Sequence, residues 1–176
     1  MSSLDANRVT ACLALFALAI LSVATQARGE TPRSGSFSAT QPAAALLGDK
    51  ATEYDGLFSA DEDITWRYYV PPDYRPDQPA GLLVYISPTS SGAMPKEWRS
   101  VMDRYNMIWI GADGSGNRTR VPRRILLALL AVDLARQDYV LDERRIYLSG
   151  FSGGGRVASM AAIDHAEVFS GGLFFC

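Results

Sequence analysis

The sequence predicts an α/β domain built on a mainly parallel β-sheet with flanking helices. Apolar runs typical of strands buried on both faces recur along the chain, at 81–87, 107–112, 145–148 and 170–176. Stretches with the apolar spacing of helices lie between these runs. A hydrophobic content of 48% in 176 residues is ordinary for a folded chain and allows one domain with its own core.

The N-terminal 27 residues have the pattern of an export signal. A short polar stretch with one basic residue, Arg8, precedes a nearly unbroken apolar run at 9–24, and Thr25-Gln26-Ala27 then offers small residues for cleavage. This pattern predicts a signal peptide over 1–27 and a periplasmic or secreted protein that is not embedded in the membrane. An uncleaved membrane anchor is the alternative, because the run is close to the lower length limit for a bilayer span.

The segment between the signal and the domain has little periodicity. Residues 28–60 are rich in Ser, Thr, Pro, Gly and Ala, which predicts a linker or loosely held N-terminal segment. The domain itself is expected over 61–176. Its first strand is predicted at 64–70, where aromatic and β-branched residues are dense and Pro71-Pro72 ends the run.

Two helices are expected between the apolar runs. The first has Pro95 in its first turn and an apolar face with i, i+3, i+4, i+7 spacing, formed by Trp98, Val101, Met102 and Tyr105. The second begins near Thr119, which is a suitable N-cap, and is apolar almost all round over 125–134. Such a helix is expected to be buried against the sheet.

The most informative stretch is the strand–turn–helix pattern around Ser152. The apolar run at 145–148 stops at Gly150-Phe151-Ser152-Gly153-Gly154, and a helix-compatible run of small residues follows. In that context G-x-S-x-G predicts a nucleophile elbow, in which Ser152 is exposed at the tip of a strained turn. The alternative is a glycine-rich turn that only packs tightly or binds a phosphate at the helix N-terminus. Neither a dinucleotide fingerprint nor a P-loop fits the spacing.

The charge and the metal-ligating residues limit the possible partners. A formal net charge of −2 gives no reason to expect nucleic acid. The chain has one histidine, and Cys176 is the one cysteine that follows the predicted signal peptide. Because these residues cannot form a typical zinc site, we expect no metal and no other cofactor.

These residues resemble the α/β-hydrolase superfamily, and within it secreted esterases related to polyhydroxybutyrate depolymerases and feruloyl esterases. The resemblance covers about 64–176 and depends on three segments, Tyr68–Pro72, Leu82–Gly92 and Asp142–Gly154. It implies an incomplete α/β-hydrolase fold, a three-layer sandwich, and an acyl-enzyme mechanism on a small-molecule or polymeric ester.

The resemblance also implies roles for individual residues. Ser152 would be the nucleophile and the Gly153 N–H one oxyanion donor. The second donor would come from the loop after 82–87, where family members often have His-Gly and this chain has Ser87-Pro88. Because proline has no N–H, Thr89 is the expected donor, with Ser90 as a less favoured choice.

The general base and its acid are not found where the family has them, after the serine. The one histidine, His165, lies 13 positions after Ser152, which on a helix is roughly 20 Å, far beyond hydrogen-bond reach. The run at 170–176 also reads as a strand cut in its middle. We therefore expect the N-terminal part of a longer serine hydrolase, inactive or nearly so alone.

A second class of function is a non-catalytic binding module on a hydrolase fold. Trp66, Tyr68, Tyr69 and Trp98 could supply aromatic contacts to a polymer, although core packing is the more usual role of such residues. A thiol function of Cys176 is not expected, because no Lys, Arg or His lies in 169–175 to lower its pKa.

Overall fold

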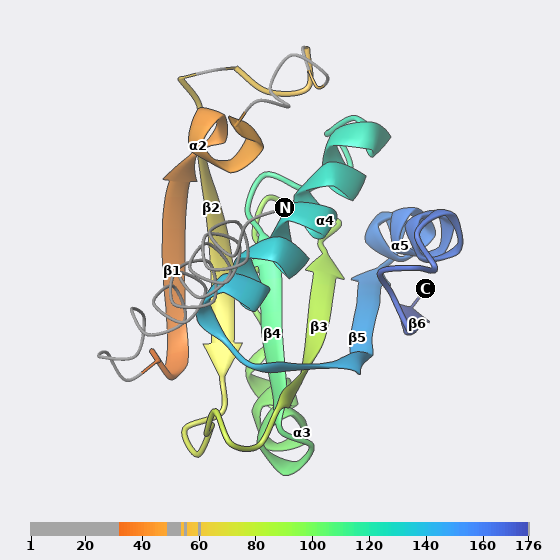
Figure 1. Cartoon of the computed structure of the whole chain (residues 1–176). Coiled ribbons are helices and arrows are strands. Elements are labelled where there is room, and N and C mark those ends of the chain that lie inside the picture. The colour runs from red at the N-terminus through yellow and green to blue at the C-terminus, as the bar shows by residue number, and fades with distance from the viewer. Residues whose placement is uncertain (1–31, 49–53, 55, 60, 176) are drawn as a thin grey trace, which may run out of the picture. The chain divides into compact units, whose positions relative to one another are not determined.

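The computed structural model describes residues 32–48, 54, 56–59 and 61–175, so the predicted signal peptide lies outside the described residues (Figure 1). The described elements are, in chain order, β1 (Gly35–Pro42), α2 (Ala43–Leu47), β2 (Asp63–Val70), β3 (Ala80–Ile86), the 3₁₀ turn η2 (Lys96–Trp98), α3 (Arg99–Arg104), β4 (Met107–Ala112), α4 (Val121–Asp138), β5 (Leu141–Phe151), α5 (Gly153–Asp164) and β6 (Gly171–Phe175). None of the helices in these ranges has the length and apolarity needed to cross a bilayer.

The six strands form one sheet in the order β1-β2-β4-β3-β5-β6. The strands β4, β3, β5 and β6 run parallel to one another, whereas β1 pairs antiparallel with β2, and β2 antiparallel with β4. The predicted mainly parallel sheet is therefore confirmed. The strands β3 and β4 are buried along almost their whole length, as their continuous apolar runs predict.

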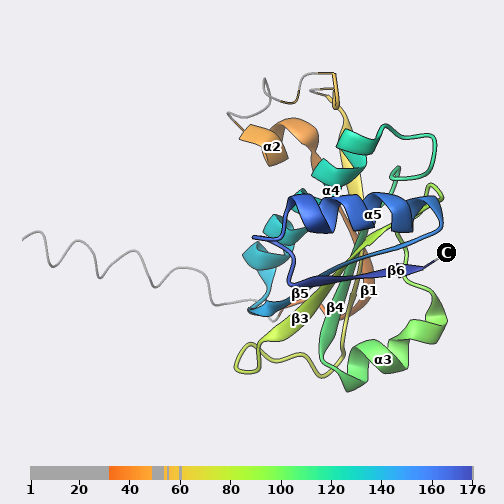
Figure 2. The ribbon, with the colours of Figure 1, turned by 90° about the vertical axis from the view of Figure 1, so that its right-hand side faces the viewer.

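Helices cover both faces of this sheet. The main core lies between the sheet and α4 and α5, and it includes side chains of both helices such as Leu127, Val132 and Val157. A smaller core with Met102 and Trp109 lies on the opposite face, under α3. Figure 2 shows α4 and α5 on one side of the strands and α3 on the other. This arrangement is the predicted three-layer sandwich.

The segment 28–60 is not only a linker, so that prediction is wrong in part. Its residues 35–42 form β1, which pairs along its full length with β2 from Gly35↔Val70 to Pro42↔Asp63. Side chains of β1 alternate between half-buried and exposed, and the ring of Phe37 stacks on Tyr68 at 4.8 Å. The strand escaped prediction because most of its side chains are small and polar, which is typical of an edge strand.

Two details of the predicted helices are also wrong. The first helix is short, and of its predicted apolar face Met102 is buried, whereas Val101 and Tyr105 are 43% and 56% exposed. Thr119 does not cap α4, because its hydroxyl donates instead to Gly114 O at 2.7 Å. The N-cap residue is Arg120, whose side chain makes no capping hydrogen bond.

Candidate active site

Ser152 forms the turn between β5 and α5. Its backbone has φ 52° and ψ −123°, a combination that residues with a Cβ rarely adopt and that costs about 1–3 kcal/mol. Two hydrogen bonds hold the turn, from Ser152 N to Phe175 O at 2.7 Å and from Arg156 N to Ser152 O at 3.1 Å. The serine side chain is exposed at the tip. This is the geometry expected of a nucleophile elbow.

Glycines at 150 and 154 let the elbow helix approach the sheet. A Cβ on Gly150 would lie 2.7 Å from Gly155 N. A Cβ on Gly154 would overlap the carbonyl oxygen of Ile86 and lie 2.9 Å from its carbonyl carbon. Since real Cβ atoms essentially never come within 3.0 Å of such neighbours, only glycine fits at either position. The helix therefore packs directly on the end of β3.

Gly153 is the first residue of α5, where helix N–H groups have no acceptor within the helix. An N–H in this position, next to Ser152, can donate to a negative charge that develops beside the serine. Asn117 lies close by, since a Cβ on Gly153 would come 2.8 Å from the Asn117 side-chain carbon Cγ. The loop after β4 thus reaches the elbow.

The loop after β3 contains the predicted second oxyanion donor. The Thr89 N–H donates to Ser87 Oγ at 3.1 Å, and the two hydroxyl groups of these residues lie 3.0 Å apart. To bind an oxyanion, the Thr89 amide must therefore give up this bond within its own loop. Within the described part of the chain, no acceptor is seen for the Ser90 N–H.

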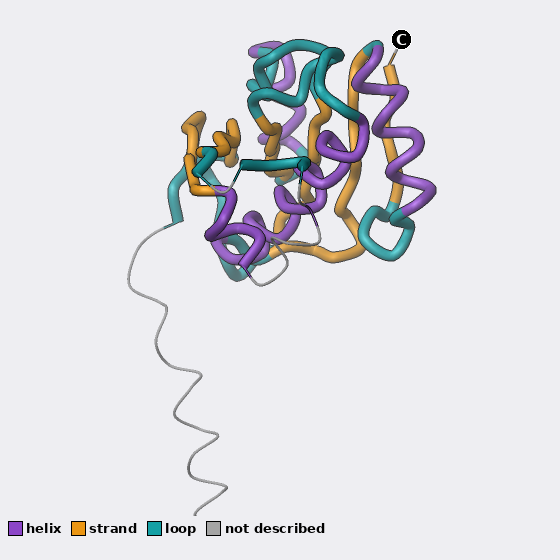
Figure 3. Tube along the Cα trace, turned by 90° about the horizontal axis from the view of Figure 1, so that it is seen from above, coloured by secondary structure: helices purple, strands orange, loops and turns teal. Residues whose placement is uncertain are grey.

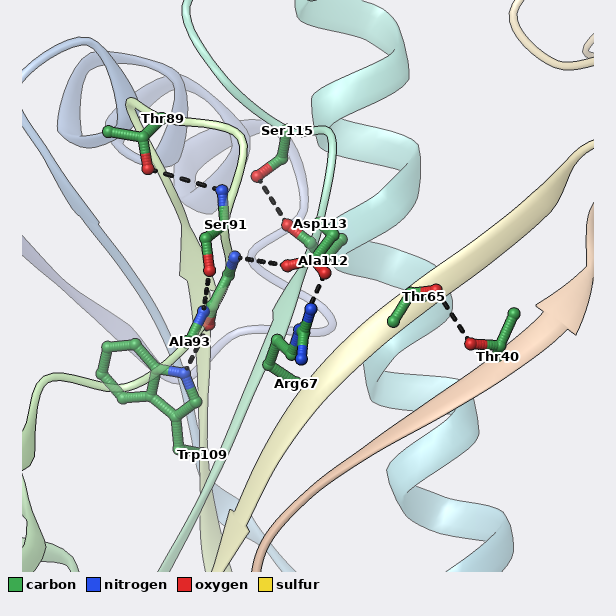
Figure 4. Close-up of polar contacts among 11 residues, drawn as sticks. Thr40, Thr65, Arg67, Thr89, Ser91, Ala93, Trp109, Ala112, Asp113 and Ser115 are labelled. Atoms are coloured by element: carbon green, nitrogen blue, oxygen red, sulfur yellow. Dashed lines mark hydrogen bonds and ion pairs between the residues drawn. The ribbon is translucent and has the colours of Figure 1, made fainter.

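The loop after β4 holds the loop after β3 in place by several hydrogen bonds. Asn117 N donates to Pro88 O at 3.0 Å, and Gly114 N donates to Ser90 O at 2.8 Å. The Asp113 carboxylate accepts from Gly92 N at 2.9 Å and pairs with Arg67 Nε at 2.7 Å (Figure 4). Asp113 therefore connects both loops to β2.

A cavity of about 360 Å³ opens between these two loops. Figure 3 looks onto the carboxyl ends of the parallel strands, from which the loops rise. The cavity is lined by Pro88, Thr89, Ser90, Gly114, Gly116, Asn117, Arg118 and Thr119. Because Asn117 also abuts Gly153, this cavity lies next to the elbow. In open α/β sheets, ligands bind at this end of the strands.

The one histidine of the chain is far from Ser152. His165 follows the last residue of α5, whose twelve residues begin directly after the serine. At 1.5 Å per residue the separation is about 20 Å. Its Nδ1 lies 3.4 Å from the Glu167 carboxylate. His165 is therefore no base for Ser152 in this fold, as its sequence position predicts.

Comparisons with known proteins support this fold assignment. No protein-family model matches the sequence, and no curated protein matches it. Among solved structures, a putative dipeptidyl aminopeptidase IV from Bacteroides ovatus matches with a TM-score of 0.59 at 18% identity, over 78% of this chain and 20% of that one. A thermostable esterase matches with 0.55 at 16% identity, over 79% and 40%. Est1E from Butyrivibrio proteoclasticus matches with 0.54 at 15%, over 66% and 48%.

These matches and the strand order show the fold of the protein. The chain has the α/β-hydrolase fold in incomplete form, as the sequence predicts, with an esterase among its structural neighbours. It spans between one fifth and about half the length of these solved structures. At such low identities the likeness establishes the fold, and the site residues have to be argued from their own geometry.

Proposed function

We propose that this chain carries the nucleophile and the oxyanion donors of an exported serine hydrolase that cleaves carboxylic esters. The observation that carries the proposal is the strained backbone of Ser152, at φ 52°, between a parallel strand and a helix that begins with three glycines. Strain of this kind persists where the surrounding structure enforces it, and it clusters at active sites. A glycine-rich turn that served only for packing would have no need of a strained serine at its tip.

The reaction follows from this arrangement. Ser152 Oγ attacks the carbonyl carbon of the ester, and its proton passes to a general base. The carbonyl oxygen becomes an oxyanion that the Gly153 N–H binds, together with the Thr89 N–H once that amide has left Ser87 Oγ. The intermediate then collapses, the C–O bond to the alcohol breaks, and the alcohol leaves with a proton. Water later attacks the acyl-serine and releases the acid.

We further propose that the base and its acid come from polypeptide outside residues 1–176. His165 is too distant from the serine, and the chain has no other histidine. The strand β6 forms an edge of the sheet, and its side chains Leu173, Phe174 and Phe175 are 38–44% exposed. An apolar edge of this kind favours further strands beside it. On this proposal the 176-residue chain alone turns over esters poorly.

The substrate and location are proposed only as classes. One of the three structural neighbours described above is named an esterase, which supports an ester as the substrate class. A cavity of about 360 Å³ suits a small acyl or alcohol group, whether free or at the end of a polymer. Export is supported by the pattern of residues 1–27.

The binding-module alternative loses most of its proposed surface. Trp66, Tyr68 and Tyr69 are at most 4% exposed. Trp98 is half-buried and packs its ring against Trp109 and Phe175 at 5.9 and 5.8 Å. The aromatic side chains suggested for polymer contact therefore belong mainly to the two cores.

The proposal can be tested on the chain itself by supplying the missing base. Because Ser152 is exposed, free imidazole can reach its hydroxyl and act in place of a histidine. A fluorophosphonate is expected to modify Ser152 at a rate that rises with imidazole concentration, and with pH as imidazole loses its proton. Peptide mass spectrometry identifies the modified residue.

Two variants control this experiment. Ser152→Ala is expected to abolish the modification. Ser159→Ala, the same change about two turns further along α5, is expected to leave it unchanged. Modification that ignores imidazole, or that is spread over several serines, would contradict the proposed role of Ser152. Rapid modification without imidazole would show that the chain already holds a base. That result would refute only the proposal that the base lies outside residues 1–176.

A further inference from the structure

Arg124 is a buried charged side chain that the proposed reaction does not yet use. It lies at the end of the first turn of α4 and is 3% exposed. Its Nη2 donates to Ser87 O at 3.0 Å, while its Nε has no acceptor among the described residues. None of the ion pairs within these residues involves Arg124. Burial lowers the pKa of this guanidinium from its ordinary value, although an arginine stays charged at neutral pH.

Stabilisation of the fold does not explain the buried guanidinium of Arg124. A buried charge without a counterion costs free energy, and well-packed apolar residues in its place are often neutral or stabilising. The preceding residue shows the contrast. Arg123 pairs with the Glu62 carboxylate and also donates to Leu57 O at 2.5 Å, so it joins α4 to the segment before β2. Arg124 instead directs its charge at one backbone carbonyl.

That carbonyl belongs to Ser87, the first residue of the loop after β3 that contains the proposed oxyanion donor Thr89. Ser87 follows β3 directly and is itself 2% exposed. Its N–H donates to Ser115 Oγ at 3.4 Å, its Oγ accepts from Thr89 N, and its carbonyl accepts from Arg124. All the polar groups of Ser87 are therefore engaged. The Arg124 bond sets the plane of the peptide between Ser87 and Pro88, immediately before Thr89.

The same peptide adjoins the elbow. Gly154 packs so closely that a Cβ there would lie 2.9 Å from the Ile86 carbonyl carbon and 3.2 Å from that of Ser87. The helix α5 and the loop after β3 thus meet at the backbone of Ile86 and Ser87. Gly154 packs against the Ile86 carbonyl, and the Arg124 guanidinium binds the Ser87 carbonyl. A rotation of the Ser87 carbonyl would move the loop amides relative to Ser152.

We propose that Arg124 is a positioning residue that holds the Ser87 carbonyl and thereby fixes the Thr89–Ser90 amides next to the Ser152 elbow. This inference rests on the proposed function, because the position of the loop amides affects a reaction rate only if Ser152 Oγ is the reacting nucleophile. Arg124 touches no reacting atom and acts through Ser87. A displacement of about 1 Å in such a site can reduce a rate by roughly 100-fold.

The test compares two neighbouring arginines in the full chain. Arg124→Met is expected to speed hydrogen exchange of the Thr89 amide, which donates to Ser87 Oγ, by at least about 10-fold. It should slow the imidazole-dependent phosphonylation of Ser152 by about 10- to 100-fold. Its thermal midpoint should be unchanged or higher, because an unpaired buried charge is removed. Arg124→Lys, which keeps a donor, should recover part of the rate.

Arg123→Met is the matched control. It removes an arginine one position earlier, so its thermal midpoint should fall while loop exchange and phosphonylation stay as in the wild type. Unchanged loop exchange in Arg124→Met would overturn the proposal, and so would faster exchange with an unchanged rate. A wild-type chain that is never phosphonylated would overturn the proposed function instead, and with it the catalytic part of this inference. The exchange data would still decide whether Arg124 anchors the loop.

Discussion

The close packing of α5 on the end of β3 predicts an unusual response to the substitution Gly154→Ala. Gly154 is a helical residue, and helix propensity alone would make alanine about 1 kcal/mol more stable there. The structure predicts the opposite sign. The new Cβ would lie 2.9 Å from the Ile86 carbonyl carbon, with the carbonyl oxygen closer still.

The magnitude follows from that distance. Ordinary contacts between carbon atoms are about 3.5–4.0 Å, so helix and strand must separate by more than about half an ångström. Both obstacles are backbone, and no side chain can rotate away. Overpacking typically costs about 1–3 kcal/mol, and this site belongs at the upper end. A loss of about 3 kcal/mol lowers the ratio of folded to unfolded chain by roughly 100-fold and the thermal midpoint by about 6–12 °C.

Urea unfolding of Gly154→Ala and Gly171→Ala measures this effect against a control. A Cβ on Gly171 would lie 3.5 Å from the Tyr147 ring, which is ordinary contact. That variant should stay within about 1 kcal/mol of the wild type, since alanine mainly restricts the unfolded chain. A Gly154→Ala chain as stable as the wild type, or more stable, would refute the direct packing of the elbow on β3.

Three further predictions concern other parts of the chain. The Arg123 guanidinium holds the pKa of Glu62 below its ordinary 4.5, so the pair stabilises the fold above that pH and its contribution is lost as the pH falls through the folded-state pKa. Glu62→Gln should therefore cost about 1 kcal/mol of unfolding free energy at pH 7. The difference in stability between the two chains should close as the pH falls through the folded-state pKa of Glu62, which lies below 4.5. A difference independent of pH would contradict the ion pair. Asp113→Ala removes the acceptor of Gly92 N and the partner of Arg67, so it should cost about 1–2 kcal/mol of unfolding free energy, measured in urea. The control Asp77→Ala, at an exposed ion pair, should cost less than about 0.5 kcal/mol. Equal losses would be evidence against the role of Asp113 in connecting the two loops to β2. N-terminal sequencing of the exported protein should begin at Arg28, and a membrane-bound product that retains Met1 would instead support the uncleaved anchor.

The elements that the sequence predicts well have strong local signals. The strands β3 and β4 are continuous apolar runs, and these are buried on both faces as predicted. The elbow helix follows from a glycine cluster and small residues within a few positions of Ser152. In contrast, β1 is an edge strand with mostly small side chains that alternate between half-buried and exposed. Its place in the sheet depends on pairing with β2, some 28 positions further on.

The supports of the candidate site depend on contacts between distant positions. Arg124 and Ser87 are 37 positions apart, and Arg67 and Asp113 are 46 apart. Neither pair has a spacing that a helix or strand period would bring to notice. Arg124 moreover precedes an apolar helical run together with Arg123, which suggests a solvated helix start. Its burial follows from the position of the first turn of α4 next to Ser87, which only the folded chain shows.

Ser152 as the acyl-accepting nucleophile is the central claim of this account. The most direct measurement is mass spectrometry of the protein purified from its native cells, rapidly quenched after mixing with p-nitrophenyl acetate. The account predicts one acetyl group on the peptide that contains Ser152, and an intact protein longer than residues 28–176 that carries a downstream acid and histidine. Acetylation elsewhere, or none in a protein that hydrolyses the ester, would contradict the claim.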